Sequence, residues 1–451
     1  MTKPLHPAAD LAAELALLQR HTFGYFIHEA NPANGLVRDN TRYGSASSIA
    51  AIGLGLACYP VAVRRGYLTR EEAAGRTRTT LDFFAESPQG PEPDATGYRG
   101  FFYHFLDQRT GRRAHGCELS TMDTAILLAG ALTAAEFFDG NDAPEVEIRR
   151  LAQLLYRATD WAWALDGGLA VRQGWTPEAG FLPFRWQGYN EALILYVLAL
   201  GSPSHPIPEQ SYRAWTASYE WKKVYGIEFL YGGPLFMHQI SHLWIDFRGI
   251  RDAYMEEKGI DYFENSRRAT LVQQRYADRN PRRFRGYSRD IWGITASDGP
   301  GPAVRRIGGR LRRFDGYNAR GVPHGPDDGT LSPWAVIASL PFAPEVVLPT
   351  FAAYLRTYPD VKARYGLLCS LNPTFGAGGR SSGTWISKGY YGLDQGPVVL
   401  MIENFGSEMT WNLMRRCRPF IDGLKRAGFA GGWLETPVAG GLLDRGGKET
   451  S

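Results

Sequence analysis

Apolar residues recur at helical spacing along most of the chain. Within residues 10–28, leucines and phenylalanines repeat every three to four positions, which predicts an amphipathic helix. Residues 47–64 are rich in Ala and Gly and nearly uncharged, as is typical of an inner helix packed on both sides. Thr69 is placed to cap a third helix that runs to about residue 84, and its Arg and Glu residues predict an outer position. Inner and outer helices are therefore expected to alternate.

The same two characters continue along the chain. Residues 120–138 form an apolar stretch, whereas residues 145–165 carry an amphipathic pattern. We expect further helices at residues 191–200, 209–221, 235–250, 262–279, 333–340, 344–355 and, in at least two pieces, 396–427.

Signals for β-strands are few. Short aromatic or apolar stretches at residues 100–105 and 168–171 stand beside turn-forming Gly residues, and we interpret them as hairpins in loops. No change of composition and no Ser/Pro-rich linker divides the chain. The sequence therefore predicts an all-α protein with short loop hairpins, folded as one domain over residues 1–451.

Composition excludes several classes of protein. The 451 residues are 44% apolar and 21% charged, and no stretch approaches the roughly 18 consecutive apolar residues of a membrane span. A net charge of +4 is too small and too dispersed to indicate nucleic acid as a partner. The N-terminus lacks the apolar stretch of a secretory signal, so we expect a cytoplasmic protein as written, or a periplasmic one if a signal was removed. Nothing in the sequence indicates an oligomeric state.

The sequence contains no metal, redox or nucleotide signature. Four cysteines, at positions 58, 117, 369 and 417, stand far apart without a C-x-x-C pair, which favours buried free thiols. No phosphate-binding P-loop is present. We therefore expect no cofactor.

One histidine pattern has two interpretations. His238, His242 and Asp246 recur at i, i+4 and i+8 of the predicted helix 235–250, which would place them along one face. A metal site is the weaker interpretation, because Gln239 stands where H-E-x-x-H requires Glu. We favour hydrogen bonding of His238 or Gln239 to a sugar, with His242 as a core histidine and no metal bound.

Aromatic residues make up 13% of the chain, and many stand in Gly-rich, polar loops. A pyranose presents a C–H face and a rim of hydroxyls, so a sugar site needs flat rings beside polar groups. Arg42 and Tyr43, in the loop before the second helix, could bind sugar hydroxyls, although an Arg–Asp structural pair is the alternative. The candidate stacking residues, some of which we expect in the core instead, are Trp175, Phe184, Trp186, Tyr189, Trp292, Trp385 and Tyr390.

Several motifs together resemble a known family. The chain is similar, from about residue 15 to 430, to the glucoamylase-like family of bacterial endo-β-1,2-glucanases, glycoside hydrolase family 144. The resemblance implies an (α/α)6 barrel, a β-1,2-glucan substrate and hydrolysis with inversion at the anomeric carbon. Asn190 and Asp298, which stand in the matching motifs, are candidate substrate-binding residues, with a structural role as the alternative for Asp298. The motifs that carry the resemblance are residues 121–125 (TMDTA), 188–191 (GYNE), 238–242 (HQISH), 292–300 (WGITASDGP) and 392–397 (GLDQGP).

Glycoside hydrolysis requires two carboxyl groups facing one cleft. Glu191 is our candidate general acid, because it follows a polar aromatic loop and precedes an apolar helix, where desolvation would raise its pKa. Asp394, before a predicted helix, or Asp123, in the first turn of an apolar helix, would assist the attack of water. Each has a structural alternative: a first-turn charge for Glu191, an N-cap for Asp394, and a structural role in place of a catalytic or sugar-binding one for Asp123. Glu118, five residues before Asp123, is explained by a helix-start charge. Asp298 and Glu403 are further inward-facing acids.

Two features leave the activity open. Residues 301–314 contain five arginines and depart from the family pattern, either as a solvated surface excursion or as an anion-recognition loop. An exo-acting enzyme that releases sophorose, or a transglycosylase, would use the same linkage. A non-catalytic glycan-binding protein and an enzyme for another glycan are further alternatives.

Overall fold

The computed structural model describes residues 7–376 and 383–435. They group into two compact units. The first unit comprises the chain up to Tyr25, Trp221–Ile240 and Glu264–Gly406. The second unit comprises Phe26–Glu220, Ser241–Phe263 and the chain from Ser407 onward. The single domain over residues 1–451 stays a prediction.

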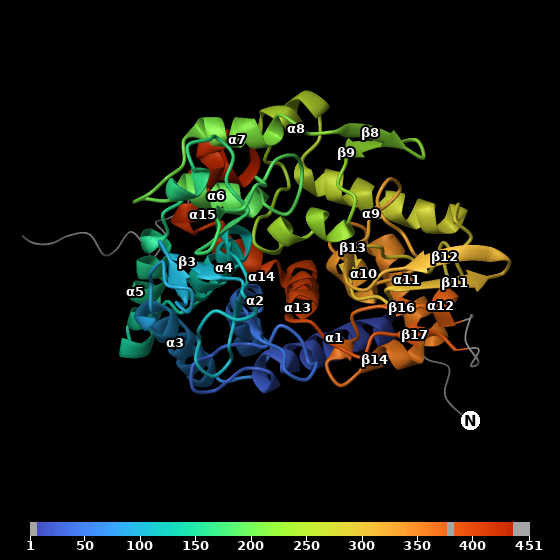
Figure 1. Cartoon of the computed structure of the whole chain (residues 1–451), viewed down its shortest axis with the longest axis horizontal. Helices are drawn as coiled ribbons and strands as arrows, with labels where there is room; N and C mark the ends of the chain where they lie inside the picture. The colour runs from blue at the N-terminus through green and yellow to red at the C-terminus, as the bar shows by residue number, and fades with distance from the viewer. Residues whose placement is uncertain (1–6, 377–382, 436–451) are drawn as a thin grey trace, which may run out of the picture. The chain divides into compact units, whose positions relative to one another are not determined.

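Two nearly uncharged helices, α2 (Ile49–Arg64) and α4 (Thr121–Phe137), form the centre of the second unit and pack along each other (Figure 1). Their backbones meet at Gly53 and Gly130. A Cβ on Gly130 would lie 1.9 Å from the carbonyl oxygen of Gly53, and a Cβ on Gly53 would lie 2.4 Å from that of Ile126. Glycine at these positions is therefore required by the close approach of the helices, as expected for a Gly-rich inner helix.

Outer helices cover this pair with their charged faces toward solvent. Helix α3 (Arg70–Glu86) begins at Thr69, whose side chain and that of Glu72 form a reciprocal capping box, so the predicted cap is confirmed. It packs against α5 (Ala143–Ala158), and Arg70 pairs with Glu145 at 2.6 Å. The alternation of apolar and amphipathic helices expected from the sequence is thus present here.

A second close helix contact joins α6 (Leu193–Gly201) to α15 (Arg418–Arg426). A Cβ on Gly201 would lie 2.0 Å from the Pro419 carbonyl oxygen, and one on Gly423 would lie 1.9 Å from that of Val197. The unit is completed by the short helices α7 (Glu209–Thr216), α8 (Ala253–Lys258) and α14 (Met409–Met414).

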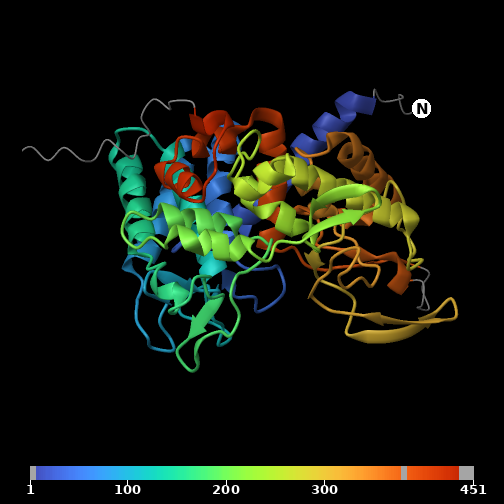
Figure 2. The ribbon, with the colours of Figure 1, turned by 90° about the horizontal axis from the view of Figure 1, so that it is seen from above.

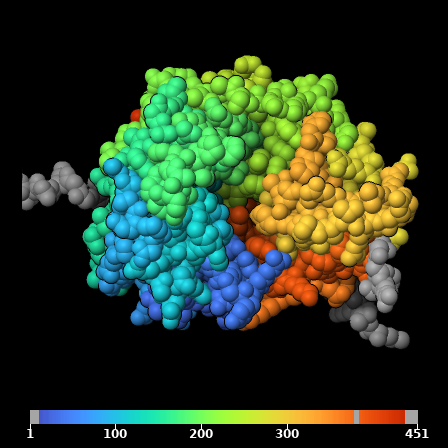
Figure 3. Space-filling view, viewed as in Figure 1, coloured from blue at the N-terminus to red at the C-terminus, as the bar shows by residue number. Residues whose placement is uncertain are grey.

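A small antiparallel sheet lies at the N-terminal end of α4. Its strand order is β2 (Gly97–Tyr98), β3 (Phe101–Tyr103), β5 (Leu119–Ser120), β6 (Gly174–Thr176) and β7 (Gly180–Phe181). In Figure 3 the light-blue surface of the early strands adjoins the green surface of the segment that contains β6 and β7. The sheet fixes where α4 begins, because β5 runs directly into it.

The first unit has its own apolar core, built around the fully buried Trp292 and the adjoining Trp334, Phe351 and Tyr354. Its main helices are α1 (Pro7–His28) as far as Tyr25, α9 (Tyr262–Arg279) from Glu264, α10 (Pro333–Ala338), α11 (Pro344–Thr357), α12 (Pro373–Gly376) and α13 (Gly392–Ser407) as far as Gly406. Short strand pairs join them, namely β8 (Trp221–Val224) with β9 (Ile227–Leu230), β10 (Ala296–Ser297) with β13 (Asn318–Ala319), β14 (Lys362–Ala363) with β15 (Gly366–Leu367), and β16 (Leu371–Asn372) with β17 (Trp385–Ile386).

The arginine-rich excursion is a β-hairpin of β11 (Ala303–Ile307) and β12 (Arg310–Phe314) that stands out from its unit (Figure 2). Gly308 and Gly309 both have positive φ, of +55° and +76°, as the twisted two-residue hairpin turn requires. Opposed Arg305 and Arg312 face inward, with their guanidinium groups over the rings of Phe375 and Phe284.

Three predicted elements are wrong. The segment 235–250 forms the 3-10 turns η2 (Leu235–His238) and η3 (Ile240–Leu243) instead of one helix, so the common face expected for its histidines does not form. The helix predicted at 209–221 ends at Thr216, and strand β8 begins at Trp221. Residues 168–171 form turns and no strand.

Among the described helices, none is both long and apolar enough to cross a membrane. Cys58, Cys369 and Cys417 are buried free thiols as expected, whereas Cys117 is half-buried. The described chain is helix-rich with many short strand pairs, so the fold class is confirmed at this level.

We expect Gly130→Ala to lower the free energy of unfolding of the second unit by roughly 1–3 kcal/mol, since the new methyl group meets the Gly53 backbone and the helices must separate. The control is Gly75→Ala on α3, where no described atom lies within 4 Å of the added Cβ. It should stabilise by about 0.5–1 kcal/mol through helix propensity. Chemical denaturation followed by circular dichroism measures both, and equal effects would contradict the packing argument.

Candidate active site

Asp123 lies in the first turn of α4, which follows directly after strand β5. The Ser120 side chain caps the helix by accepting a hydrogen bond from the Asp123 amide at 3.1 Å, and its Oγ donates to Asp123 Oδ2 at 2.5 Å. The carboxylate is only partly exposed, at 16% of its side-chain surface. Asp123 is therefore held at the rim of an apolar helix rather than buried within it.

The loop that precedes α6 is fastened to the same helix end. Trp186 Nε1 donates to Thr121 Oγ1 at 3.1 Å, and the Trp186 carbonyl accepts from Tyr196 at 2.9 Å. Ser241 Oγ accepts from the Ile194 amide at 3.1 Å and donates to the Glu191 carbonyl at 3.3 Å. These contacts fix the backbone of Glu191 next to the start of α4.

The sequence predicted Glu191 in the first turn of a helix. In the structure it lies in a turn just before α6. Its Oε2 is fully buried and has no hydrogen-bond partner among the residues that the structure describes. Burial, and to a smaller extent the nearby charge of Asp123, raises the pKa of Glu191 to about 7. A carboxyl group of this kind is protonated in a large fraction of molecules at neutral pH and can donate its proton.

Three further ionisable groups, all in the second unit, surround Asp123. His104 lies between β3 and β4 (Phe105–Leu106), with Nδ1 2.9 Å from Glu118 and Nε2 3.6 Å from Asp123. Asp39 is also close enough for its charge to act on His104 and Asp123. Sequence reasoning missed His104 and Asp39, and it took Glu118 for a helix-start charge. The one available signal was a polar histidine inside the aromatic segment 101–106.

Asp394 and Asp298, both in the first unit, lie close to one thiol, that of Cys369. Asp394 is in the first turn of α13 and 3% exposed, so the structural alternative of an N-cap before the helix is wrong. The Asp298 amide donates to Cys369 Sγ at 3.4 Å, and Asp298 Oδ2 accepts from Ser387 at 2.7 Å. Burial raises the pKa of the Cys369 thiol, and the charges of Asp394 and Asp298 raise it further. The two acids thus share one neighbourhood in the first unit.

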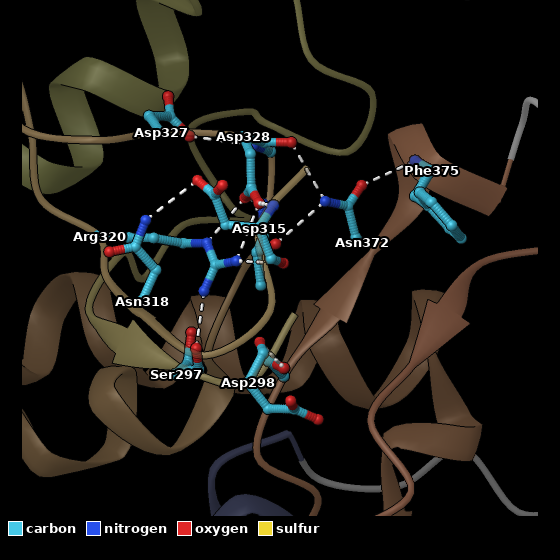
Figure 4. Close-up of polar contacts among 12 residues, drawn as sticks. Ser297, Asp298, Asp315, Asn318, Arg320, Asp327, Asp328, Asn372 and Phe375 are labelled. Atoms are coloured by element: carbon cyan, nitrogen blue, oxygen red, sulfur yellow. Dashed lines mark hydrogen bonds and ion pairs between the residues drawn. The ribbon is translucent and has the colours of Figure 1, made fainter. Parts of the chain in front are cut away.

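A buried arginine fixes the backbone beside Asp298 (Figure 4). Arg320 binds Asp328 in bidentate fashion, through Nε at 2.7 Å and Nη2 at 2.8 Å, and donates to the Ser297 carbonyl at 2.7 Å and the Gly316 carbonyl at 2.9 Å. Burial alone would raise the pKa of Asp328, but Arg320 outweighs it and holds that pKa below its ordinary value. Figure 4 shows the Asp298 side chain pointing away from this cluster.

Some candidate stacking rings are accessible in their units and others are not. Trp175, Trp186, Tyr189 and Trp385 are half-buried, and Phe184 is 67% exposed. Trp175 packs against Tyr98 and Trp163, and Tyr189 packs against Tyr219 and Tyr262. Tyr390 is mostly buried, with its ring edge-on to Tyr365.

Three predicted substrate contacts are corrected by burial. Trp292 is fully buried in the core of the first unit, so its ring offers no face to a sugar. His238 and Gln239 are 1% and 0% exposed. His238 Nε2 lies 3.1 Å from the Gly232 carbonyl oxygen, and Gln239 Nε2 donates to the Ala335 carbonyl at 2.6 Å. These two side chains therefore serve the interior of the unit.

The remaining polar candidates occupy loops or ion pairs. Arg42 and Tyr43 lie in an exposed loop, and the charge of Arg42 acts on nearby Asp39, as in the structural alternative. Asn190 Oδ1 accepts from the Ala192 amide at 3.0 Å and shapes the turn at Glu191. Glu403 is buried and accepts from Gln19 at 3.1 Å. Asp246 binds Arg248 and Arg415, and in residues 7–376 and 383–435 no cluster of His, Cys, Asp or Glu is placed to hold a metal ion.

With this geometry in view, the chain can be compared with known proteins. A family model named Glycoamylase, described as "Putative glucoamylase", matches residues 183–418, more than half of the chain. The chain belongs to the Glycoamylase family. The matched part of this Glycoamylase-family chain contains Glu191, Asp298 and Asp394, whereas Asp123 lies before it.

Three relatives of this Glycoamylase-family chain are informative. It is 28% identical over 437 residues to the exo β-1,2-glucooligosaccharide sophorohydrolase (non-reducing end) of Parabacteroides distasonis, covering 88% of its own length and 55% of that protein. It thus spans about half the length of this curated relative. An endo-β-1,2-glucanase from Chitinophaga pinensis, solved with sophorotriose and glucose, superposes with a TM-score of 0.80 at 25% identity, covering 94% and 99% of the two chains. A β-1,2-glucanase from P. distasonis gives a TM-score of 0.81 at 26% identity, covering 95% of this chain and 61% of that one.

We expect Arg320→Gln to lower the free energy of unfolding of the first unit by about 3–5 kcal/mol, because it leaves Asp328 buried without its cation. The control is Arg313→Gln, which removes an arginine that is 82% exposed and paired only with Asp315 among the described acids. It should change stability by less than about 0.5 kcal/mol. Urea denaturation separates the two, and a small effect of Arg320→Gln would show that the buried pair does not fix this region.

Proposed function

We propose that this chain is a glycoside hydrolase that cleaves internal β-1,2-glucosidic bonds of β-1,2-glucan with inversion at the anomeric carbon. The observation that carries the proposal is the buried Glu191 carboxyl group with its raised pKa next to Asp123. The substrate is inferred from the relatives, whose names specify β-1,2-linked glucans or glucooligosaccharides.

We further propose that the helices form an (α/α)6 barrel. Two observations support this architecture: inner helices α2 and α4 alternate with outer helices α3 and α5, and the chain superposes along nearly its whole length on the Chitinophaga glucanase.

The proposed reaction needs only water and two carboxyl groups. Glu191 donates its proton to the glycosidic oxygen as the bond from that oxygen to the anomeric carbon breaks. A water molecule attacks the anomeric carbon from the opposite face and gives its proton to a carboxylate. The products are two shorter glucans, and one carboxyl group has lost a proton while the other has gained one, so a proton exchange with solvent restores the enzyme.

Two carboxylates are candidates for the group that assists water. Asp123 has the support of its nearness to Glu191, and Asp394 has the support of its place in the matched segment. Substrate contacts are proposed for Asp298 and Tyr390 in the first unit, and for the half-buried or exposed loop residues Arg42, Tyr43, Trp175, Phe184, Trp186, Tyr189, Asn190 and Trp385.

An exo-acting enzyme that releases sophorose is the second candidate function. It is favoured by the curated relative, which is an exo-acting sophorohydrolase. A transglycosylase on the same linkage has no comparable support among these relatives.

We expect Glu191→Gln to lower kcat/KM on linear β-1,2-glucan by about 10²–10⁴-fold, because an amide has no proton to donate to the leaving oxygen. In the wild type, kcat/KM should fall about tenfold for each pH unit above 7, since the pKa of Glu191 is about 7 and only its protonated form is active. Initial rates across pH 5–9 measure both effects.

The matched control for this variant is Glu136→Gln. Burial raises the pKa of Glu136 to about 7 as well, but the residue lies 13 positions along α4 from Asp123, or about 20 Å. It should keep wild-type kcat/KM. Full activity of the Glu191 variant would remove Glu191 from the reaction, and loss in both variants would indicate a general effect of altering buried acids.

Products formed early in the reaction test the mode of action. We expect purified protein to release β-1,2-linked oligosaccharides of mixed length from linear β-1,2-glucan, with the new reducing ends first appearing as the α-anomer by NMR. Laminarin and cellulose oligosaccharides should remain intact. Sophorose alone would support the exo-acting enzyme, products longer than the substrate would support transfer, and no cleavage of any glucan would refute a glucanase.

A further inference from the structure

His104 is fixed in the second unit through both its backbone and its ring. Its amide donates to the Glu118 carbonyl at 3.0 Å, and its carbonyl accepts from the first residue of α2, Ile49, at 3.2 Å. The imidazole stacks on the ring of Phe105 at 4.0 Å between centroids, with 12° between the planes. The ring therefore has little freedom to turn away from its neighbours.

Both ring nitrogens of His104 face carboxylates. Nδ1 lies 2.9 Å from Glu118 Oε1, and Nε2 lies 3.6 Å from Asp123 Oδ2. A neutral imidazole would form only the hydrogen bond between Nδ1 and Glu118, whereas the imidazolium also forms an ion pair with Asp123. The arrangement thus favours a positively charged ring that links two elements of the unit, the segment before β5 and the start of α4.

The protonation states follow from this geometry. Burial alone would lower the pKa of His104, but Asp123, Glu118 and Asp39 outweigh it and raise that pKa to about 9. Burial alone would raise the pKa of Glu118, but the hydrogen bond and the charge of His104 outweigh burial and lower that pKa below its ordinary value. At neutral pH, His104 is a cation among carboxylates.

Two arginines lie close enough for their charges to act on the carboxylates around His104. Arg42 acts on Asp39, and Arg113 acts on Glu118. The closest charged neighbour of Asp123 among the described ion pairs is His104, while Asp123 in turn acts on Glu191. The cluster therefore places an anion next to the carboxyl group that must keep its proton.

We propose that His104 is a positioning residue of the hydrolytic site: anchored by Glu118, it orients the Asp123 carboxylate and balances its negative charge beside Glu191. This inference rests on the proposed function and deepens it, because it favours Asp123 as the carboxylate that receives the proton of water. Two acids in opposite protonation states are what hydrolysis with a separate acid and base requires. His104 itself makes no contact with the reacting atoms.

The test is His104→Gln in the full chain, which keeps a polar side chain but removes the charge. Asp123 then lies among carboxylates without a cation, and repulsion between like charges disfavours its carboxylate form, so the acidic limb of kcat/KM on β-1,2-glucan should move to higher pH. At pH 6 we expect kcat to fall about tenfold, with KM changed less than about twofold. Glu118→Gln should shift the limb in the same direction by a smaller amount.

A second histidine provides the control. The ring of His115 meets that of Phe105 edge-on, at 6.2 Å between centroids, and it forms no ion pair with a described carboxylate. His115→Asn should leave the pH profile unchanged. If His104→Gln instead lowers activity by the same factor at every pH and lowers the unfolding midpoint in parallel, His104 is only structural and the proposal is overturned.

NMR titration of the His104 ring separates this proposal from the proposed function, because it requires no substrate. We expect a pKa near 9 in the wild type and a fall of at least about one unit in Asp123→Asn and in Glu118→Gln. An ordinary pKa in the wild type would overturn the positioning role even in an active enzyme. Wild-type protein that hydrolyses no β-1,2-glucan, with the titration as expected, would refute the proposed function.

Discussion

The second unit depends on one steric constraint, the backbone contact of α2 with α4. Gly53 and Gly130 leave no room for a side chain between the two helices, so the helices approach more closely than Ala would allow. This approach brings the start of α2, where the Ile49 amide donates to the His104 carbonyl, to the helix whose first turn carries Asp123. The candidate acid site is therefore assembled at one end of a helix pair whose backbones meet at two glycines.

Burial and charge act in opposite directions on neighbouring groups of this site. Glu191 is desolvated and has no hydrogen-bond partner for Oε2 within the described chain, which favours its neutral form. Glu118 interacts with a cation, which favours its charged form. In the first unit, two buried acids have polar partners: Asp298 accepts a hydrogen bond from the Ser387 hydroxyl, and Asp328 is paired with Arg320.

Long periodic segments and capping signals were predicted well from the sequence. The helix at 262–279 and the capping residue Thr69 match the structure, because local interactions decide them. The helix predicted at 235–250 was wrong, because spacing of apolar residues alone does not distinguish one α-helix from two short 3-10 turns. Trp292 stands in a Gly-containing motif but packs in the core, which neighbouring residues alone do not reveal. The candidate site was predicted in part. Glu191 and Asp123 were both named, and the charge of Asp123 acts on Glu191 in the structure. His104 could not be predicted, because its partners Glu118 and Asp123 lie 14 and 19 positions further along the chain.

The β11–β12 hairpin is held to its unit by its inward-facing arginines, while Val304 and Leu311 on the other face are exposed. Because these anchors lie below the Gly308–Gly309 turn, cross-strand pairs added or removed at the tip leave them in place. The reach of this arm can therefore change during evolution, pair by pair, without repacking the core to which it is attached.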